Sequence, residues 1–184
     1  MTELCNSVTV RFGDKAVLDG VTLAVPEKGV TWLSGASGVG KTTLLRVLAG
    51  LVKPEPGTVT LPGRGVMLFQ EDRLFPRLSA LAQVQAVLPR QRRGEAVKWL
   101  ELAELSDAAH LPPQKLSGGM ARRAALARAL AVEGDIWLLD EPFAGVDPAR
   151  QERILKGLKA LDRPVVLTGH QESLRTWADH IIEL

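Results

Sequence analysis

Residues 35–43 constrain the fold of this chain more than any other stretch. They are Gly35, Ala36, Ser37, Gly38, Val39, Gly40, Lys41, Thr42 and Thr43. A glycine, four residues and then Gly-Lys-Ser/Thr is the spacing of a phosphate-binding loop, which connects a strand to a helix. Residues 30–33 (VTWL) predict a short buried strand, and residues 43–50 (TLLRVLAG) predict a helix closed by glycine. The motif therefore lies in the strand–loop–helix context that it requires.

The residue types of this loop suit a phosphate. Glycines let the backbone turn tightly, so that successive N–H groups and the helix N-terminus point at one anion. Lys41 adds a mobile positive charge at the outer phosphates, and the Thr42 hydroxyl is a ligand for Mg²⁺. A glycine-rich turn that matches by chance is the alternative, and the flanking strand and helix argue against it. We expect the chain to bind a nucleoside triphosphate.

Composition limits what surrounds the loop. A chain of 184 residues can bury one core and a small satellite, so we expect a single domain over residues 1–184. The net charge of +2 is near balance, and the basic run at 90–93 is interpreted as a solvated turn, so no nucleic-acid surface is expected. The single cysteine, Cys5, fits a reducing compartment. Residues 1–6 lack an export signal, and arginines interrupt the alanine-rich stretch 121–132, so any membrane connection would come through a partner.

The first half of the chain predicts two kinds of strand. Residues 3–25 alternate loosely and contain short Gly-Asp and Asp-Gly turns, which indicates an antiparallel meander. Phe12, at its first turn, is either a core residue or a flat surface for a nucleotide base. Residues 58–61 and 66–69 predict further strands, and Gln70 directly follows the second. Ligands of open α/β sheets lie at the carboxyl ends of the strands, which places Gln70 near the nucleotide.

The middle of the chain predicts helices. Ser79 can cap a helix that ends before Pro89, and residues 94–105 repeat the helical period, so residues 71–116 form a small helical insertion. Ser117, Gly118 and Gly119 then precede an alanine-rich helix over 121–132. This helix start is a second anion-binding end without a lysine, or only a capped helix.

Carboxylates and a histidine follow the later strands. The buried run 136–139 delivers Asp140 and Glu141 at its carboxyl end, where two adjacent carboxylates fit a Mg–phosphate site. Residues 145–148 form a turn before a helix over 149–161. His170 lies just past the run 165–168, at the same sheet edge, whereas His110 and His180 have no such placement. A last strand over 180–184 ends the chain.

In this order the motifs resemble the ATP-binding cassette (ABC) family over nearly the whole chain. Residues 35–42 resemble its Walker A loop, Gln70 resembles its Q-loop, and residues 116–119 (LSGG) resemble its signature. Residues 136–141 resemble its Walker B motif with the catalytic glutamate, residues 145–147 resemble its D-loop, and His170 resembles its switch histidine. Phe12 falls where the family places an aromatic residue under the adenine. The Ser-Gly-Gly signature between Q-loop and Walker B is nearly private to this family.

The chain departs from the family pattern at four places. Met120 replaces the usual glutamine after the signature glycines, and residues 169–171 (GHQ) differ from the usual Thr-His-Asp. Residues 50–70 are shorter than usual, which implies a trimmed β-subdomain. The chain ends soon after the switch histidine, from which we expect no regulatory C-terminal domain.

The resemblance implies a fold and a division of the chain. We expect an α/β fold with a P-loop NTPase (RecA-like) core, a mostly parallel sheet, an N-terminal antiparallel β-subdomain and a small α-helical subdomain. Residues 1–70 and 117–184 would form the β-subdomain and nucleotide-binding core, and residues 71–116 the helical subdomain.

It also implies roles for single residues. ATP and Mg²⁺ would bind the phosphate loop, with Mg²⁺ held by Thr42, Gln70 and Asp140. Glu141 would deprotonate the attacking water, Lys41 would offset charge on the phosphoryl group, His170 would hold the γ-phosphate and Gln70 would report its presence. The Ser117–Gly119 helix end of a second copy would complete each site, so that ATP joins a head-to-tail dimer with two composite sites. Asp147 of the D-loop would be a further nucleotide-binding residue.

Partners follow from the same resemblance. Residues 70–78 resemble the docking stretch of bacterial nitrate/sulfonate/taurine-type importer ATPases, so we expect an integral membrane permease there, with a substrate-binding protein in the complex and no nucleic acid. Leu74 and Phe75 are expected to be partly exposed, because a partner covers them. The subunit would lie on the cytoplasmic face of a bacterial membrane. The transported solute is not encoded in this chain.

Other classes of protein remain as alternatives. An exporter ATPase subunit would share every motif named above. A chromosome-maintenance ATPase would need a long coiled coil between Gln70 and Ser117, where no sustained heptads occur. Translation-factor cassettes occur as two linked copies. A small-molecule kinase has no reason for the signature or for His170, and a stand-alone ATPase or signalling adaptor completes the set.

Overall fold

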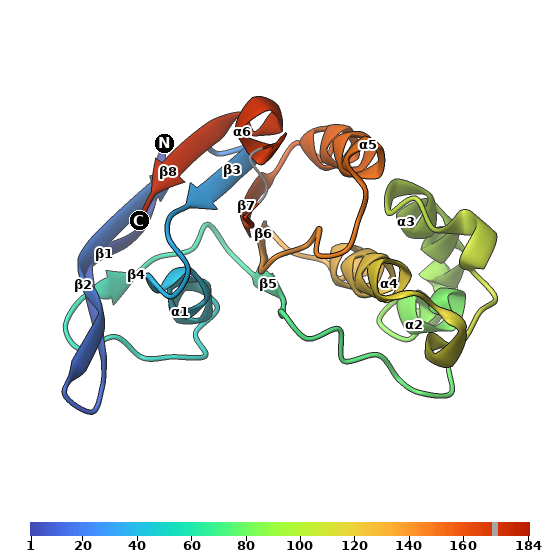
Figure 1. Cartoon of the computed structure of the whole chain (residues 1–184), viewed down its shortest axis with the longest axis horizontal. Coiled ribbons are helices and arrows are strands. Elements are labelled where there is room, and N and C mark those ends of the chain that lie inside the picture. Colours follow the sequence, from blue (N-terminus) through green and yellow to red (C-terminus); the bar gives the residue numbers. More distant parts are fainter. Residues whose placement is uncertain (171–172) are drawn as a thin grey trace.

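The computed structural model describes residues 1–170 and 173–184, without the side chain of Ser173. Two sheets and the helices around them make up the fold (Figure 1). One sheet has three strands in the order β2-β1-β4, and the other has five in the order β5-β6-β7-β3-β8. The predicted α/β architecture, with a parallel sheet and a separate N-terminal antiparallel sheet, is confirmed.

The antiparallel sheet is built around a long hairpin. β1 (Thr2–Phe12) pairs with β2 (Lys15–Val25), and β4 (Thr58–Val59) pairs with the other edge of β1. Gly13 takes a positive φ of 59° in the tight turn of the hairpin, a conformation that glycine adopts without strain. The predicted antiparallel pairing and the turn at Gly13 are confirmed, but the predicted turn at Asp19-Gly20 is wrong, because both residues lie inside β2 where the register with β1 shifts. β4 is shorter than the predicted strand at 58–61.

The parallel sheet holds the core. It consists of β3 (Gly29–Ser34), β5 (Gly65–Leu68), β6 (Ile136–Leu139), β7 (Pro164–Thr168) and β8 (His180–Glu183). All of its pairings are parallel, and the central strands β6 and β7 are buried along their whole length. Their apolar runs follow from this burial on two faces, since each residue meets side chains on one face or the other.

Helices cover both faces of this sheet. α1 (Lys41–Leu48) packs on the face that Leu138 and Val166 reach. α4 (Gly118–Ala131) and α5 (Pro148–Lys159) pack on the face that Leu139 and Val165 reach. Figure 1 shows this layering, with α1 on one side of β6 and β7 and with α4 and α5 on the other. α6 (Ser173–Trp177) precedes β8.

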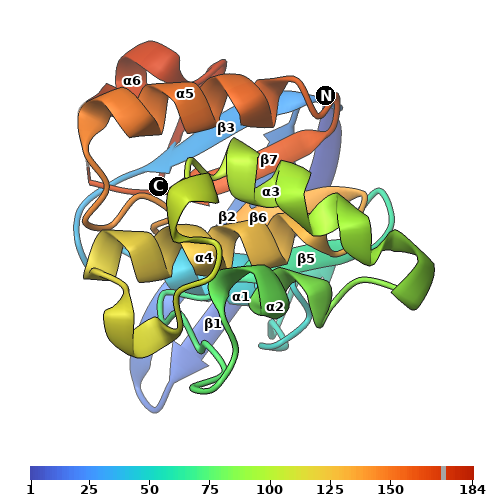
Figure 2. The ribbon, with the colours of Figure 1, turned by 90° about the vertical axis from the view of Figure 1, so that its right-hand side faces the viewer.

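The helical segment packs on α4. It contains α2 (Ala80–Gln85), α3 (Ala96–Leu102) and the short 3-10 helices η1 (Arg90–Glu95), η2 (Ser106–Ala108) and η3 (Pro113–Lys115). The Ser79 hydroxyl accepts from the Ala82 N–H at 3.2 Å, as expected of the cap of α2. α2 and α3 lie beside α4 (Figure 2), where small side chains of α4 let them approach. α4 therefore belongs to both packing units, and the proposed boundary at residue 117 stays a prediction.

The basic run at 90–93 is not a turn, which corrects the interpretation from sequence. It begins the 3-10 helix η1, where the Arg92 guanidinium contacts the carboxylates of Glu95 and Glu133. The hydrogen bond from Arg92 and a second from Lys98 lower the pKa of Glu95 to about 2. Two cations, Arg92 and Lys98, thus pair with two carboxylates, which accounts for the position of Arg92, whereas Arg90 and Arg93 are exposed to solvent.

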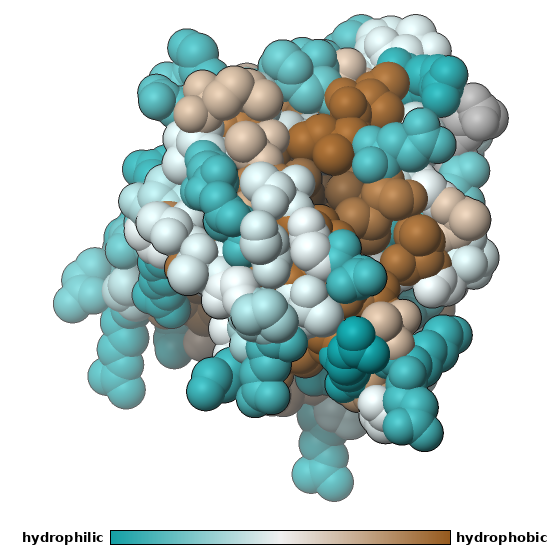
Figure 3. Space-filling view, turned by 90° about the vertical axis from the view of Figure 1, so that its left-hand side faces the viewer, coloured by the Kyte–Doolittle hydropathy of each residue, from teal (hydrophilic) through white to brown (hydrophobic). Residues whose placement is uncertain are grey.

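Two surface features bear on partners. No helix in residues 1–170 and 173–184 is long and apolar enough to cross a bilayer. Apolar residues gather in a band on the face of the molecule that carries the hairpin and β8 (Figure 3).

Cys5 lies buried in β1 as a free thiol, and burial raises its pKa.

Candidate functional site

The predicted motifs meet in one cleft at the carboxyl ends of the parallel strands. The cleft has a volume of about 250 Å³. It is lined by Val17, Ser37, Gly38, Gly40, Lys41, Thr42, Thr43, Gln70, Asp140, Glu141, Thr168 and His170. Apart from Val17, which lies in β2, these residues lie at or after the carboxyl ends of β3, β5, β6 and β7, whose parallel directions bring those ends to one edge of the sheet. Motifs that are far apart in sequence therefore share one site.

The phosphate loop lies between β3 and α1, as predicted. Gly40 takes a φ of 113° at the N-cap of α1, without a side-chain cap, so the first N–H groups of the helix have no competing side-chain acceptor. A Cβ at Gly40 would lie 2.8 Å from the Val17 carbonyl oxygen, and one at Gly35 would lie 2.8 Å from the Leu184 carbonyl oxygen. The Lys41 ammonium donates to the carbonyl oxygens of Gly35 and Ala36, both at 2.8 Å. Close packing therefore requires glycine at positions 35 and 40 of this loop.

Asp140 links the loop to β7. It is 1% exposed, and its Oδ1 accepts from the Thr42 hydroxyl at 3.0 Å and from the Thr168 hydroxyl at 2.8 Å. Its Oδ2 is buried and has no hydrogen-bond partner among the described residues. A buried, unpartnered carboxylate oxygen beside a hydroxyl is unfavourable by itself, and a hard cation such as Mg²⁺ would satisfy it. The oxygen atoms of Asp140 and Thr42 are therefore suitable ligands for that ion.

Glu141 has an unusual backbone conformation. Its φ is 49°, in the left-handed region that residues other than glycine rarely adopt. Its N–H donates to the Thr168 hydroxyl at 2.9 Å, and its Oε1 lies 3.3 Å from His170 Nε2. The side chain remains 28% exposed toward the cleft. Non-glycine residues in such strained conformations concentrate at functional sites.

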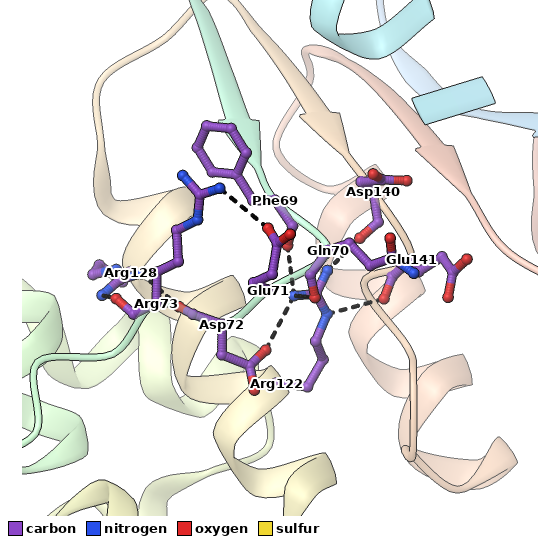
Figure 4. A network of polar contacts seen from close by, with 9 residues as sticks. All are labelled: Phe69, Gln70, Glu71, Asp72, Arg73, Arg122, Arg128, Asp140 and Glu141. Atoms are coloured by element: carbon purple, nitrogen blue, oxygen red, sulfur yellow. Dashed lines mark hydrogen bonds and ion pairs between the residues drawn. The ribbon is translucent and has the colours of Figure 1, made fainter. Parts of the chain in front are cut away.

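Gln70 enters the cleft from the segment after β5. Its carbonyl oxygen accepts from Arg122 of α4 at 3.1 Å (Figure 4). The same guanidinium contacts the peptide oxygens of Asp140 and Glu141. Sequence reasoning assigned no role to Arg122 or Thr168. The signals were a charged residue in an alanine-rich helix and a hydroxyl at the end of an apolar strand.

The remaining predicted binding residues lie outside this cleft. Ser117 caps α4, where its hydroxyl accepts from the Met120 N–H at 3.3 Å, and its side chain is exposed. A Cβ at Gly119 would lie 2.1 Å from the Gly145 carbonyl oxygen, so the start of α4 touches the turn before α5. Asp147 caps α5, and the hydrogen bond from the Arg150 side chain lowers the pKa of this carboxyl. Phe12 is 58% exposed at the tip of the hairpin.

The structure thus divides the predicted site into two groups. Lys41, Gln70, Glu141 and His170 converge on the cleft, whereas the helix start at 117–119 presents its N–H groups elsewhere on the surface. Gln171, which was noted for its departure from the family pattern, lies outside the described residues.

The known proteins that this chain resembles are ATP-binding proteins of transport systems. The profile of the family described as "ABC transporter" matches residues 18–144. The chain is 46% identical over 180 residues to the aliphatic sulfonates import ATP-binding protein SsuB 1 of Nocardia farcinica, covering 94% of this chain and 74% of that protein. It is 37% identical over 186 residues to the intermembrane phospholipid transport system ATP-binding protein MlaF of Haemophilus influenzae, covering 89% of this chain and 70% of that protein. A bacterial ABC transporter cassette, solved as a dimer, superposes with a TM-score of 0.84 at 29% identity, covering 100% of this chain and 94% of the other.

Proposed function

The chain belongs to the ABC transporter family, and on that premise we propose that it is the ATP-hydrolysing subunit of a bacterial transporter, working as an ATP-dependent dimer. One observation carries the proposal. The loop lysine, Glu141 and His170 share a cleft, while the exposed N-terminus of α4 points its anion-binding end away from it. A second copy, placed head to tail, would bring that helix end over the triphosphate.

Each group in the cleft has a task in this proposal. The phosphate loop binds the β- and γ-phosphates through backbone N–H groups, and Lys41 turns from the loop carbonyls to the outer phosphates. Glu141 takes a proton from the attacking water, and His170, 3.3 Å from its carboxylate, holds the γ-phosphate in line. The partner's helix start adds N–H donors, and Asp147 beside it helps to close the site against solvent.

The cation is a separate part of the proposal. Thr42, Gln70 and Asp140 would hold Mg²⁺, and the orphaned Oδ2 of Asp140 supports this assignment. When bound, the ion supplies positive charge that offsets the developing negative charge on the phosphates. Thr168 keeps the Asp140 carboxylate in place by donating to Oδ1.

Dilution tests the shared site. Because two chains complete each site, the rate per molecule should fall in proportion to concentration once the dimer dissociates, over about a hundredfold dilution series. Steady-state ATPase assays with an inert carrier protein would measure this, since the carrier removes losses to surfaces. A rate per molecule that stays constant across the series would show that one chain is sufficient.

A permease is the second partner in this proposal. Phe75 is 51% exposed and Leu74 is half-buried, as predicted for residues that a partner covers. The Gln83 side chain bonds both the N–H and the carbonyl of Phe75, at 3.0 and 2.7 Å. The backbone is therefore held while the ring faces solvent, which is the arrangement of a preformed contact.

Phe75→Ser is expected to weaken binding to the permease by about tenfold or more, because an exposed aromatic anchor is lost while the backbone remains held. Co-purification and titration with the reconstituted permease would measure the affinity, and ATP binding would report that the variant is folded. Ile181→Ser is the matched control. Ile181 is 43% exposed on β8, at the opposite sheet edge from β5. Equal loss in both variants would argue against docking at residues 70–78.

Direction, solute and location complete the proposal. The name of the sulfonate import relative supports import. In this proposal a substrate-binding protein delivers the solute, and this subunit is peripheral on the cytoplasmic side of the membrane. The phospholipid transport relative shows that a similar cassette also serves another class of solute. Co-purification of the membrane subunit, and identification of its solute, would decide between these classes.

A further inference from the structure

Arg122 is a buried cation that joins two segments of the nucleotide cleft. It lies in α4 and is 2% exposed. Its Nε donates to the carbonyl oxygen of Glu141 at 2.9 Å, and its Nη2 donates to that of Asp140. Its Nη1 donates to the carbonyl oxygens of Phe69 at 2.7 Å and Gln70 at 3.1 Å. Figure 4 shows the guanidinium between the end of β6 and the segment after β5.

The type of side chain matters at this position. Asp72 is the one carboxylate bonded to the guanidinium among the described residues, at 3.1 Å, and the other acceptors are peptide oxygens. A planar fork with several donors can reach acceptors on two segments at once, whereas a lysine is a single point charge. Burying a cation costs desolvation free energy that an alanine or leucine, like its neighbours in α4, avoids. Filling space alone would not call for arginine.

The contact to Glu141 bears on its strained conformation. With a φ of 49°, this residue needs its surroundings to hold it. The Thr168 hydroxyl accepts from its N–H, and Arg122 Nε donates to its carbonyl oxygen, both at 2.9 Å. The two peptide groups that flank the Glu141 side chain are therefore fixed from opposite sides. This arrangement aims the carboxylate toward His170.

Arg128, on the same helix, offers a natural comparison. Its guanidinium donates to the carbonyl oxygens of Asp72 and Arg73, both at 2.8 Å, and to Gln83 Oε1 at 3.3 Å. Arg128 thus holds the same segment after β5. In the part of the chain that the structure describes, it makes no hydrogen bond to Asp140 or Glu141. The connection to the end of β6 belongs to Arg122.

We propose that Arg122 is a positioning residue for hydrolysis, which holds the Glu141 main chain and makes its conformation depend on where residues 69–72 lie. This inference rests on the proposed function, because it takes Glu141 as the base. A partner that docks at residues 70–78 would then act on Glu141 through one side chain. The Arg122 side chain would thus couple partner docking at residues 70–78 to the position of the Glu141 main chain.

Turnover of two matched variants tests this role. Arg122→Gln is expected to lower kcat about tenfold or more and to leave the KM for ATP within about twofold, because the base is misplaced and the phosphate loop is untouched. Arg153→Gln on α5, with the same change of charge at an exposed ion pair with Glu104, is expected to keep both constants within about twofold. Rates are expressed per mole of ATP-binding sites, so that unfolded protein does not contribute. A kcat within twofold of the original chain, or an equal loss in Arg153→Gln, overturns the proposal.

Two further measurements separate positioning from folding. If Arg122→Gln retains no ATP-binding sites, Arg122→Lys replaces it, and a kcat within about twofold of the original overturns the proposal. In a Glu141→Gln background, Arg122→Gln should cause no further loss of the residual rate, since it acts through Glu141. A further tenfold loss in that background would contradict the proposed role of Arg122.

An unmodified chain without ATPase activity would refute the proposed function itself, whereas an active chain with an unaffected Arg122→Gln variant refutes only this inference.

Discussion

Replacing Glu141 with glutamine is expected to lower ATP turnover by about a hundredfold or more while ATP binding persists. A positioned general base contributes roughly this factor, and an amide cannot accept the proton from water. The main chain of residue 141 should stay in place, because its N–H and carbonyl, not its side chain, make the hydrogen bonds to the Thr168 hydroxyl and the Arg122 guanidinium. The loss of one negative charge beside the γ-phosphate also favours the ATP-bound dimer.

Phosphate release and light scattering with ATP would measure both parts of this expectation. The variant should form a long-lived dimer with ATP, and the unmodified chain a transient one. Glu152→Gln is the control, since Glu152 forms an exposed ion pair with Lys156 on α5, outside the cleft. Rapid hydrolysis by Glu141→Gln would remove this residue from the role of base.

Mixing two inactive variants is expected to restore activity. Lys41→Ala removes the ammonium from each phosphate loop, and Ser117→Arg blocks the N-terminus of each α4 with a bulky cation. In a head-to-tail dimer of the two variants, one site carries both defects and the other carries none. Random pairing makes half of the dimers mixed, so an equimolar mixture should reach up to about a quarter of the original rate.

ATPase assays of each variant alone and of the mixture would check this. Each variant alone should be nearly inactive, because both of its sites are defective. Full activity of Ser117→Arg by itself would show that the helix start is dispensable, and the site would then belong to one chain. A mixture no more active than the sum of its parts would contradict a site shared between copies.

Much of the fold followed from local patterns. The strand–loop–helix around residues 35–43 appears as predicted, because turn glycines and apolar runs act over short distances. The second turn expected in the N-terminal meander does not form, since Asp19 and Gly20 lie inside β2. Boundaries were less accurate. α5 begins at Pro148 and ends at Lys159, two residues before the expected end at residue 161, because the last turn of a helix frays more readily than its centre.

The misread segment and the missed residues share a cause. Residues 90–93 were interpreted as a solvated turn because a short basic run has no local partner, and the ion pair of Arg92 with Glu133, 41 residues away, forms only in the folded chain. Thr168 and Arg122 stood out by residue type, but were passed over because nothing near them in sequence identifies their partners. Those partners lie up to 28 residues from Thr168 and up to 53 residues from Arg122.

The amino-acid sequence alone determined the chemistry that this protein can offer. A phosphate loop works through consecutive backbone N–H groups and one lysine, so residue order is enough to identify it. Tertiary structure decided which groups act together. Thr42 and Asp140 are 98 residues apart and meet because parallel strands end at one edge of the sheet. The same packing leaves the start of α4 outside the cleft and buries Arg122 between two segments, since only the folded sheet and helices set those distances.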